Sequence, residues 1–293
     1  MKIVVTGGKG GVGKSMVATS LSFQLAKEKK VMLIDCDVEC PNDHILLSIK
    51  RKRYKVLYQM VPKLDKRKCR KCGACARVCK QNAIVAVEGK YPFFVKDVCI
   101  GCGACIIACP FGAISKSKKE IGKVFVGKNY NVFLVSGELK VGELASGEVV
   151  SQLREIAQEI DKKIKSDFVI IDSPPGIGCP VIASIRGTDF VIGVTEPSPT
   201  ALSDLKRVLF LAQKFKIKAA IIINKFDLAK NFSRKIENFA KRKGLSVLGK
   251  IPFSKDFINC TIKQKPVFEI KKNYQAIFSR IVQNLKKSWK KSS

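Results

Sequence analysis

The sequence predicts an α/β protein with a doubly wound, mostly parallel sheet into which a small α+β module is inserted. Three observations support this prediction: a strand, glycine-rich turn, helix and strand open the chain; further apolar runs of strand length follow residue 130; and a cysteine-rich segment separates the two parts. With 293 residues, 46% of them hydrophobic, the chain can bury one large core and a small second one, which excludes the disordered class.

The opening of the chain has the order of a βαβ unit. Lys2–Thr6 is an apolar strand, Lys14–Lys29 has a helical pattern, and Val31–Ile34 is a second buried strand. This order implies parallel strands joined by a right-handed crossover. We expect the pattern to stop after Asp43 and Lys50–Lys68 to be basic and irregular.

The second half of the chain continues the alternation. Helical stretches at Glu148–Lys165 and Leu202–Lys216 lie between several apolar runs of strand length. These runs are Asn131–Val135, Phe168–Ile171, Phe190–Val194, Ala219–Ile223 and Val247–Ile251. We therefore expect the main domain to comprise residues 1–60 and 120–293, with the insert at 61–119.

The composition is strongly basic. Lys and Arg number 55 and Asp and Glu 24, a formal charge of +31. One interpretation is a lysine-rich surface of solvated helix faces, which the even spread of lysines favours. The other is a polyanionic partner, such as nucleic acid, an anionic membrane surface or an acidic redox protein.

The twelve cysteines predict metal rather than disulfides. We expect a cytoplasmic protein, because Met1 and Lys2 lead directly into a strand without a signal peptide, and no apolar run reaches the roughly 20 residues that span a bilayer. Thiols stay reduced in that compartment, so clustered cysteines indicate metal ligands.

A phosphate-binding loop follows the first strand. Residues 8–15 match the pattern G-x4-G-K-[ST] and stand between a strand and a helix. The glycines allow backbone N–H groups to point inward and bind phosphate oxygens, and the helix N-terminus favours the same negative charge. We expect Lys14 to contact the β- and γ-phosphates and the Ser15 hydroxyl to bind Mg²⁺. The expected nucleotide contacts here are Gly8, Lys9, Gly10, Gly11, Val12, Gly13, Lys14, Ser15 and Met16. The alternative, a glycine turn without a ligand, is disfavoured by this context.

Two tandem cysteine runs predict two [4Fe–4S] clusters. Cys99, Cys102, Cys105 and Cys109, followed by Pro110, have the full spacing of bacterial ferredoxins. The same spacing occurs 30 residues earlier at Cys69, Cys72, Cys75 and Cys79, with Lys80 in place of the proline. Structural zinc is the alternative, but zinc sites usually use two C-x2-C pairs rather than tandem four-cysteine runs.

The ligands are expected to cross between the runs. The fourth cysteine of such a run binds the other cluster. One cluster would therefore be held by Cys69, Cys72, Cys75 and Cys109, and the second by Cys99, Cys102, Cys105 and Cys79.

Lys9, a second lysine within the loop, resembles the signature of the deviant Walker A motif of the MinD/ParA/Mrp and nitrogenase iron protein group. The resemblance implies ATP and a nucleotide-sandwich homodimer, in which Lys9 reaches the partner's nucleotide. It also implies catalytic roles for Lys9, Lys14 and Asp37, the last orienting the attacking water. Further implied roles are Mg²⁺ for Ser15, Asp35 and Asp172, the γ-phosphate for Gly176, and the adenine for Asn224 and Pro252.

Nearly the whole chain resembles MinD-superfamily P-loop ATPases with an inserted ferredoxin domain. The leading hypothesis is an ATPase that couples nucleotide state to electron transfer, with a redox protein as partner. A carrier or scaffold that delivers clusters to an apo-protein is the alternative. A positioning ATPase of the ParA/MinD type, which binds DNA or membrane, is the second.

Two further features have open interpretations. Cys179 lies seven residues after Asp172, where the nitrogenase iron protein has a cluster ligand, but the second cysteine of that site is missing here, which favours a buried structural cysteine. The terminal segment Tyr274–Lys291 has one apolar helical face. We expect it to pack on the sheet rather than to lie on a membrane surface.

Overall fold

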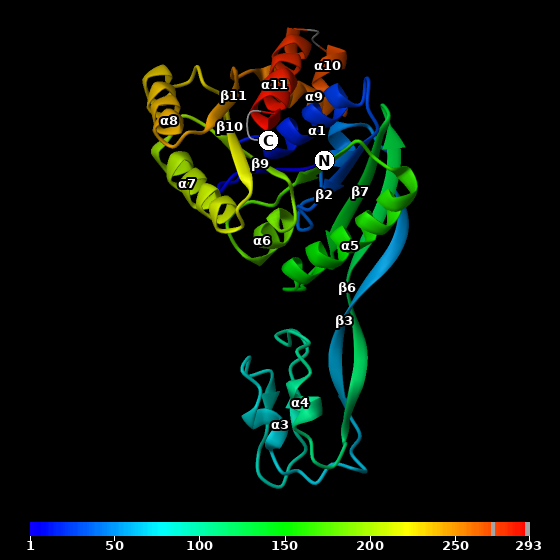
Figure 1. Ribbon diagram of the computed structural model, residues 1–293. Coiled ribbons are helices and arrows are strands. Elements are labelled where there is room, and N and C mark those ends of the chain that lie inside the picture. The colour runs from blue at the N-terminus through cyan, green and yellow to red at the C-terminus, as the bar shows by residue number, and fades with distance from the viewer. Residues whose placement is uncertain (271–272, 291–293) are drawn as a thin grey trace.

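The computed structural model describes residues 1–270 and 273–290, in which a nine-stranded sheet forms the centre of the main domain (Figure 1). The strand order is β11-β10-β9-β1-β8-β2-β7-β6-β3. The strands are β1 (Lys2–Thr6), β2 (Val31–Asp35), β3 (Lys52–Leu64), β6 (Ile114–Asn129), β7 (Val132–Leu139), β8 (Phe168–Asp172), β9 (Phe190–Thr195), β10 (Lys218–Asn224) and β11 (Ser246–Ile251).

Seven neighbouring strands, from β11 to β7, are parallel, while β6 and β3 add an antiparallel edge. The parallel part confirms the predicted doubly wound sheet. Because parallel strands end at one edge, the polar residues at their carboxyl ends come together there. In the β2–β8 pair, Asp35 lies directly opposite Asp172.

Helices cover both faces of the sheet (Figure 1). On one face, α1 (Lys14–Leu25), α9 (Lys255–Lys263), α10 (Val267–Ile270) and α11 (Asn273–Lys290) pack over Ile3, Val5 and Leu33. On the other face, α5 (Ser146–Ile164), α6 (Cys179–Ile185), α7 (Pro199–Lys214) and α8 (Lys230–Arg242) pack over Val4, Met32 and Ile221. Alternate residues of each strand thus enter different cores, as the two-residue period requires.

The insert lies at the end of a long antiparallel arm formed by β3 and β6 (Figure 1). Between the two strands of the arm, the chain forms α3 (Ala74–Arg77), β4 (Ile84–Val85), β5 (Phe93–Phe94) and α4 (Ala104–Ile107), and α3 and α4 lie beside the lower part of the arm in Figure 1. The short helix α2 (Asp43–Leu46) precedes β3. The two strands run through both expected domain boundaries, 60/61 and 119/120. The chain therefore enters and leaves the insert along a hydrogen-bonded ladder.

The expectation that Lys50–Lys68 is irregular was wrong, since most of it forms β3. The strand buries Leu57, Gln59 and Val61, which is a two-residue period. Lysines and tyrosines on its exposed positions hid that period in the sequence. Pairing with β6, more than 50 residues later, stabilises the strand.

The terminal helix α11 packs on the main domain, as expected. Phe278, Ile281 and Leu285 are buried in the core shared with α1. Lys291, at the end of the predicted segment, lies outside the described residues. In the described ranges, no helix is both long and apolar enough to cross a bilayer.

Candidate functional site

The glycine-rich loop joins β1 to α1 at the carboxyl edge of the sheet. Gly11 and Gly13 have φ values of 77° and 95°, a region that residues with a Cβ rarely occupy. A Cβ on Gly13 would also collide with the amide nitrogen of Asn224. Gly13 is therefore required both for its backbone conformation and because a side chain there would collide with Asn224.

Lys14 lies buried beneath the loop. Its Nζ is 3.3 Å from the carbonyl oxygen of Lys9, to which it donates a hydrogen bond. Burial lowers the pKa of Lys14, while the nearby carboxylates of Asp172 and Asp37 act in the opposite direction. A buried ammonium group near carboxylates can bind a phosphate anion through charge-assisted hydrogen bonds.

Three buried carboxyl groups meet beside Lys14. Asp35, Asp43 and Asp172 are each at most 1% exposed, and one oxygen from each lies within 4.8 Å of the others. Burial raises the pKa of Asp172 to about 7, although the Ser15 hydroxyl and Lys14 counteract part of this effect. Burial, together with the other carboxylates, raises the pKa values of Asp35 and Asp43 well above the usual range.

Asp43 was not among the predicted site residues. It stands in the first turn of the short helix α2 and eight positions after Asp35, so no strand end or motif indicates it. The loop between β2 and α2 folds back, and the Asp43 N–H donates to Oδ2 of Asp35 at 3.3 Å. This folding of the loop places the Asp43 side chain next to those of Asp35 and Asp172.

Asp37 and Gly176, which the resemblance assigns to the attacking water and the γ-phosphate, lie at the same edge. The Asp37 N–H donates to Oδ1 of Asp35 at 3.2 Å, and the Gly176 N–H donates to the Gly8 carbonyl at 3.0 Å. Burial raises the pKa of Asp37, and Lys14 opposes this shift. In this conformation the Gly176 N–H is thus occupied by the loop, and its role at a γ-phosphate stays a prediction.

Lys9 and Lys225 share one carboxylate. The Glu196 side chain accepts from Lys9 Nζ at 3.3 Å and from Lys225 Nζ at 2.9 Å. Lys225 Nζ also donates to the Gly11 carbonyl at 3.0 Å. Glu196 follows β9 directly, so its place at the carboxyl end of a parallel strand was a signal that the sequence prediction did not use.

The residues expected around the adenine lie at the ends of the neighbouring strands. Asn224 ends β10, is buried, and donates from Nδ2 to the Val12 carbonyl at 2.8 Å. Pro252 follows β11 directly, and Met16 lies in the first turn of α1. Asn224 thus stabilises the phosphate loop, and base contacts by these residues stay predictions.

The cysteines of the insert gather in two groups of four. A cavity of about 250 Å³ is lined by Cys79, Cys99, Cys102 and Cys105 among other residues. A smaller one of about 20 Å³ is lined by Cys69, Cys72, Cys75 and Cys109. Each cavity therefore takes three cysteines from one run and the fourth from the other run, the same partition as the predicted ligand sets. Their role as ligands stays a prediction.

The chemistry of both groups fits an iron–sulfur cluster. All twelve cysteines lie within the described residues and are free thiols. Backbone N–H groups point at several sulfurs: Lys71 N–H at Cys69 (3.4 Å), Ala83 N–H at Cys79 (3.3 Å) and Ala113 N–H at Cys109 (3.3 Å). Four thiols per cavity with N–H donors to sulfur is the donor set that [4Fe–4S] clusters use.

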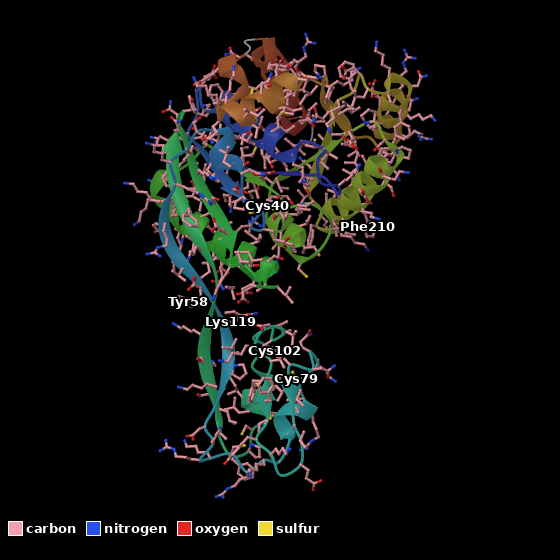
Figure 2. The ribbon with its side chains drawn as sticks, turned by 180° about the vertical axis from the view of Figure 1, so that it is seen from behind. Cys40, Tyr58, Cys79, Cys102, Lys119 and Phe210 are labelled. Atoms are coloured by element: carbon pink, nitrogen blue, oxygen red, sulfur yellow. The ribbon has the colours of Figure 1, made fainter. Side chains whose placement is uncertain are left out.

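Lys119 joins the insert to the main domain at the waist of the molecule (Figure 2). Its Nζ lies 2.7 Å from a carboxylate oxygen of Asp97, in the insert, and 2.7 Å from one of Glu143, in the loop between β7 and α5. In Figure 2 Cys102 lies between this waist and Cys79. The cavity lined by Cys102 also includes Met60 of the arm.

The remaining cysteines differ in exposure. Cys36 and Cys260 are buried, while Cys40 and Cys179 are exposed. The preference for a buried Cys179 was therefore wrong: Cys179 is the first residue of α6, next to Gly147 at the start of α5, at the surface.

Residues 3–267 match the sequence profile of a family described as the CobQ/CobB/MinD/ParA nucleotide binding domain. This match covers most of the chain. The chain belongs to the CobQ/CobB/MinD/ParA family.

Similar proteins agree with this assignment to the CobQ/CobB/MinD/ParA family. The chain is 36% identical to the uncharacterized protein MJ0578 of Methanocaldococcus jannaschii over 77% of this chain and 78% of that one. It is 24% identical to an iron-sulfur cluster carrier protein of the same organism, over 86% and 72%. The fold resembles the septum site-determining protein MinD of Pyrococcus horikoshii, solved with Mg-ADP, with a TM-score of 0.61 and 16% identity over 97% and 95%.

Proposed function

We propose that this chain is an ATP-hydrolysing iron–sulfur protein in which the nucleotide state controls electron transfer. The observation that supports this most is the gathering of eight cysteines into two groups of four at the end of an arm that leaves the nucleotide-binding domain. When bound, [4Fe–4S] clusters supply one-electron transfer, with a potential set by hydrogen bonds to sulfur, charge and solvent exposure.

The residues of the main domain would bind and orient Mg-ATP. Lys14 would neutralise the β- and γ-phosphates, and Ser15 would hold Mg²⁺ with Asp172 and Asp35 at its water ligands. Asp37, held by its N–H bond to Asp35, would orient the attacking water. Binding of the γ-phosphate would require Gly176 to leave the Gly8 carbonyl, which moves the loop that leads to α6.

The residues of the insert would hold the clusters. The group of Cys79, Cys99, Cys102 and Cys105 lies next to Met60 and Pro62 of the arm. The other group, with Cys69 and Cys109, lies next to Leu64, at the far end of β3. We infer that the first group exchanges electrons on the side of the main domain and the second with an external redox partner.

One contact path leads from Asp37 to the insert through the sheet. Val38, the next residue, accepts from the Leu139 N–H at 2.7 Å, and the Lys140 N–H donates to the Ile121 carbonyl at 2.9 Å. Ile121 belongs to β6, which also carries Lys119 and its bond to Asp97. A displacement after Asp37 would therefore be transmitted to the base of the arm.

A second path leads from Gly176 through the helices. The segment after Gly176 begins α6 at Cys179, which packs against Gly147 in the first turn of α5. One and a half turns later, Gln152 of α5 donates to the Tyr58 carbonyl of β3 at 2.9 Å. The paths from Asp37 and from Gly176 thus reach the two strands of the arm, β6 and β3.

The homodimer is part of this proposal through Lys9. Its side chain is 44% exposed and is held by Glu196 in the single chain. On ATP binding Lys9 would exchange Glu196 for the phosphates bound by a second copy, so dimer formation would depend on ATP.

The test is anaerobic EPR of the dithionite-reduced protein with and without MgATP. We expect two [4Fe–4S] signals, one of which changes its line shape or midpoint potential with MgATP. The matched control is K14A, which should keep both signals and lose the response to ATP because it lacks the phosphate-binding ammonium. Two signals that do not change when MgATP is added to the wild-type protein would contradict coupling between the nucleotide state and the clusters.

A cluster carrier is the alternative function. The 24% identical carrier protein and the exposure of Cys72 and Cys102, one in each group, favour it. Exposed ligands allow exchange with a client's thiols. The discriminating experiment mixes the loaded protein with an apo-ferredoxin. Rapid ATP-dependent transfer of iron supports a carrier, whereas clusters that stay bound through repeated redox cycles support electron transfer.

A positioning ATPase is the second alternative, favoured by the formal charge of +31. The apolar face of α11 is buried against the main domain, which leaves the basic surface to provide any attachment. Co-sedimentation with anionic liposomes and with DNA at two salt concentrations tests this alternative. ATP-dependent binding by a variant that lacks 65–113 would support it over both cluster functions.

A further inference from the structure

Three carboxylate oxygens at the buried aspartate group have no hydrogen-bond donor. They are both side-chain oxygens of Asp43 and Oδ1 of Asp172. Asp43 is 0% exposed and Asp172 1%, so water does not replace the missing donors at the surface. Buried polar atoms are almost always paired, and an unpaired buried carboxylate carries the full cost of desolvation. These oxygens therefore require a partner.

The charges around the group are unbalanced. Three carboxyl groups lie together, and among the described residues none of them forms an ion pair with a lysine or arginine. Lys14 is near enough to act on Asp172 electrostatically. One ammonium leaves about two negative charges when all three groups are ionised. A divalent cation supplies that charge.

We propose that Asp35, Asp43 and Asp172 hold a divalent cation in the absence of nucleotide, with Asp43 as a direct ligand. The donors are carboxylate oxygens, with the Ser15 hydroxyl beside Asp172, which is a set that suits Mg²⁺ or Mn²⁺. One oxygen from each residue lies within 4.8 Å of the others, and because both oxygens of Asp43 are unpaired, the one that Asp43 contributes to the group has no donor.

This site adds a role to the segment between the nucleotide and the arm. Asp43 begins α2, and β3 starts nine residues later, at Lys52. A cation bound to Asp43 therefore fixes the loop between Asp37 and the arm before ATP arrives. The proposal relates to the ATP-binding part of the proposed function, but cation binding needs neither nucleotide nor electron transfer, so each can fail without the other.

The test is a titration of the nucleotide-free, cluster-loaded protein with Mn²⁺, followed by the EPR signal of free Mn²⁺. The clusters are kept oxidised, because [4Fe–4S]²⁺ is then silent. We expect one tightly bound Mn²⁺ per chain and at least a tenfold weaker binding in D43N. E159Q, which removes an exposed carboxylate on α5, is the matched control and should bind like the wild-type protein.

Thermal unfolding shows whether D43N is folded. In EDTA it should unfold at the same temperature as the wild-type protein or higher, because it removes one of three like charges. Mn²⁺ at about 100 times its Kd should raise the Tm of the wild-type protein by several degrees, and that of D43N much less. The proposal is overturned if the wild-type protein binds no Mn²⁺ without nucleotide, or if folded D43N binds it with unchanged affinity. The first result would mean that protons, not a cation, neutralise the group, and the second would mean that Asp43 is not a ligand.

Discussion

The ammonium of Lys119 lies 2.7 Å from a carboxylate oxygen of Glu143, and both side chains are largely covered, at 15% and 9% exposure. The same ammonium bonds to the exposed carboxylate of Asp97 in the insert at 2.7 Å. One lysine on the arm therefore fixes the insert to the loop that follows β7. Because the arm has only two strands there, we expect this contact to help orient the insert.

K119Q should loosen the insert without unfolding the main domain. The change removes two charge-assisted hydrogen bonds, one to Glu143 and one to the exposed carboxylate of Asp97, which link the insert to the main domain. We expect faster hydrogen exchange in residues 52–64 and 114–120 and an unchanged rate in β1 and β8. K118Q, an exposed neighbour on β6, is the control. Unchanged exchange in K119Q would mean that strand pairing alone orients the insert.

C79S and C109S should remove different clusters. If the fourth ligands cross, C79S damages the cluster of Cys99, Cys102 and Cys105, whereas C109S damages that of Cys69, Cys72 and Cys75. Each variant should keep about four of eight irons, or about seven where a [3Fe–4S] form persists, and EPR should show the loss of a different signal in each. Loss of the same signal in both variants would contradict the crossed assignment.

E196Q should favour the ATP-dependent dimer by releasing Lys9. Burial raises the pKa of Glu196, but hydrogen bonds from Lys225 and Lys9 lower it below its usual value overall. The ion pairs are therefore intact at neutral pH and are lost as the pH falls through that lowered pKa. Sedimentation velocity with a slowly hydrolysed ATP analogue should show several-fold more dimer in E196Q.

The control for this experiment is E237Q, which breaks the exposed ion pair of Glu237 with Lys250. It should dimerise like the wild-type protein. An equal gain in both variants would show a nonspecific effect of charge, and no gain in E196Q would show that the contact does not restrain Lys9.

Thiol labelling should separate the cysteines into three classes. In the loaded protein at pH 8, iodoacetamide should modify Cys40 and Cys179, which are exposed. The eight cysteines of the insert should react only after the iron is removed. Burial raises the pKa of Cys260 to about 11. Its thiolate fraction is therefore about 0.001 at pH 8 and rises only to about 0.03 at pH 9.5.

Peptide mass spectrometry measures this pattern. Cys36, which is buried, and Cys260 should react only on unfolding, at either pH. Equal labelling of the insert cysteines before and after chelation would show that they are not ligands.

Local patterns in the sequence were sufficient to predict the parallel part of the sheet, the phosphate-binding loop and the two cysteine runs. The loop at residues 8–15 needs its glycines for backbone conformation, the apolar runs have strand length, and the two cysteine runs have a fixed spacing. These features depend on neighbours within a few residues, so they can be recognised without the fold. The same holds for Asp35 and Asp172, each of which ends an apolar strand.

Only the tertiary structure decided the arm, the aspartate group and the two ion-pair junctions. The strand β3 depends on a partner that begins at Ile114, and Asp43 joins Asp35 and Asp172 because a loop folds back. Lys119 meets Glu143 and Asp97, and Glu196 meets Lys9, across long separations in sequence. Such contacts arise from chain packing, since a lone charged residue has the same appearance in a sequence whether its partner is water or a distant side chain.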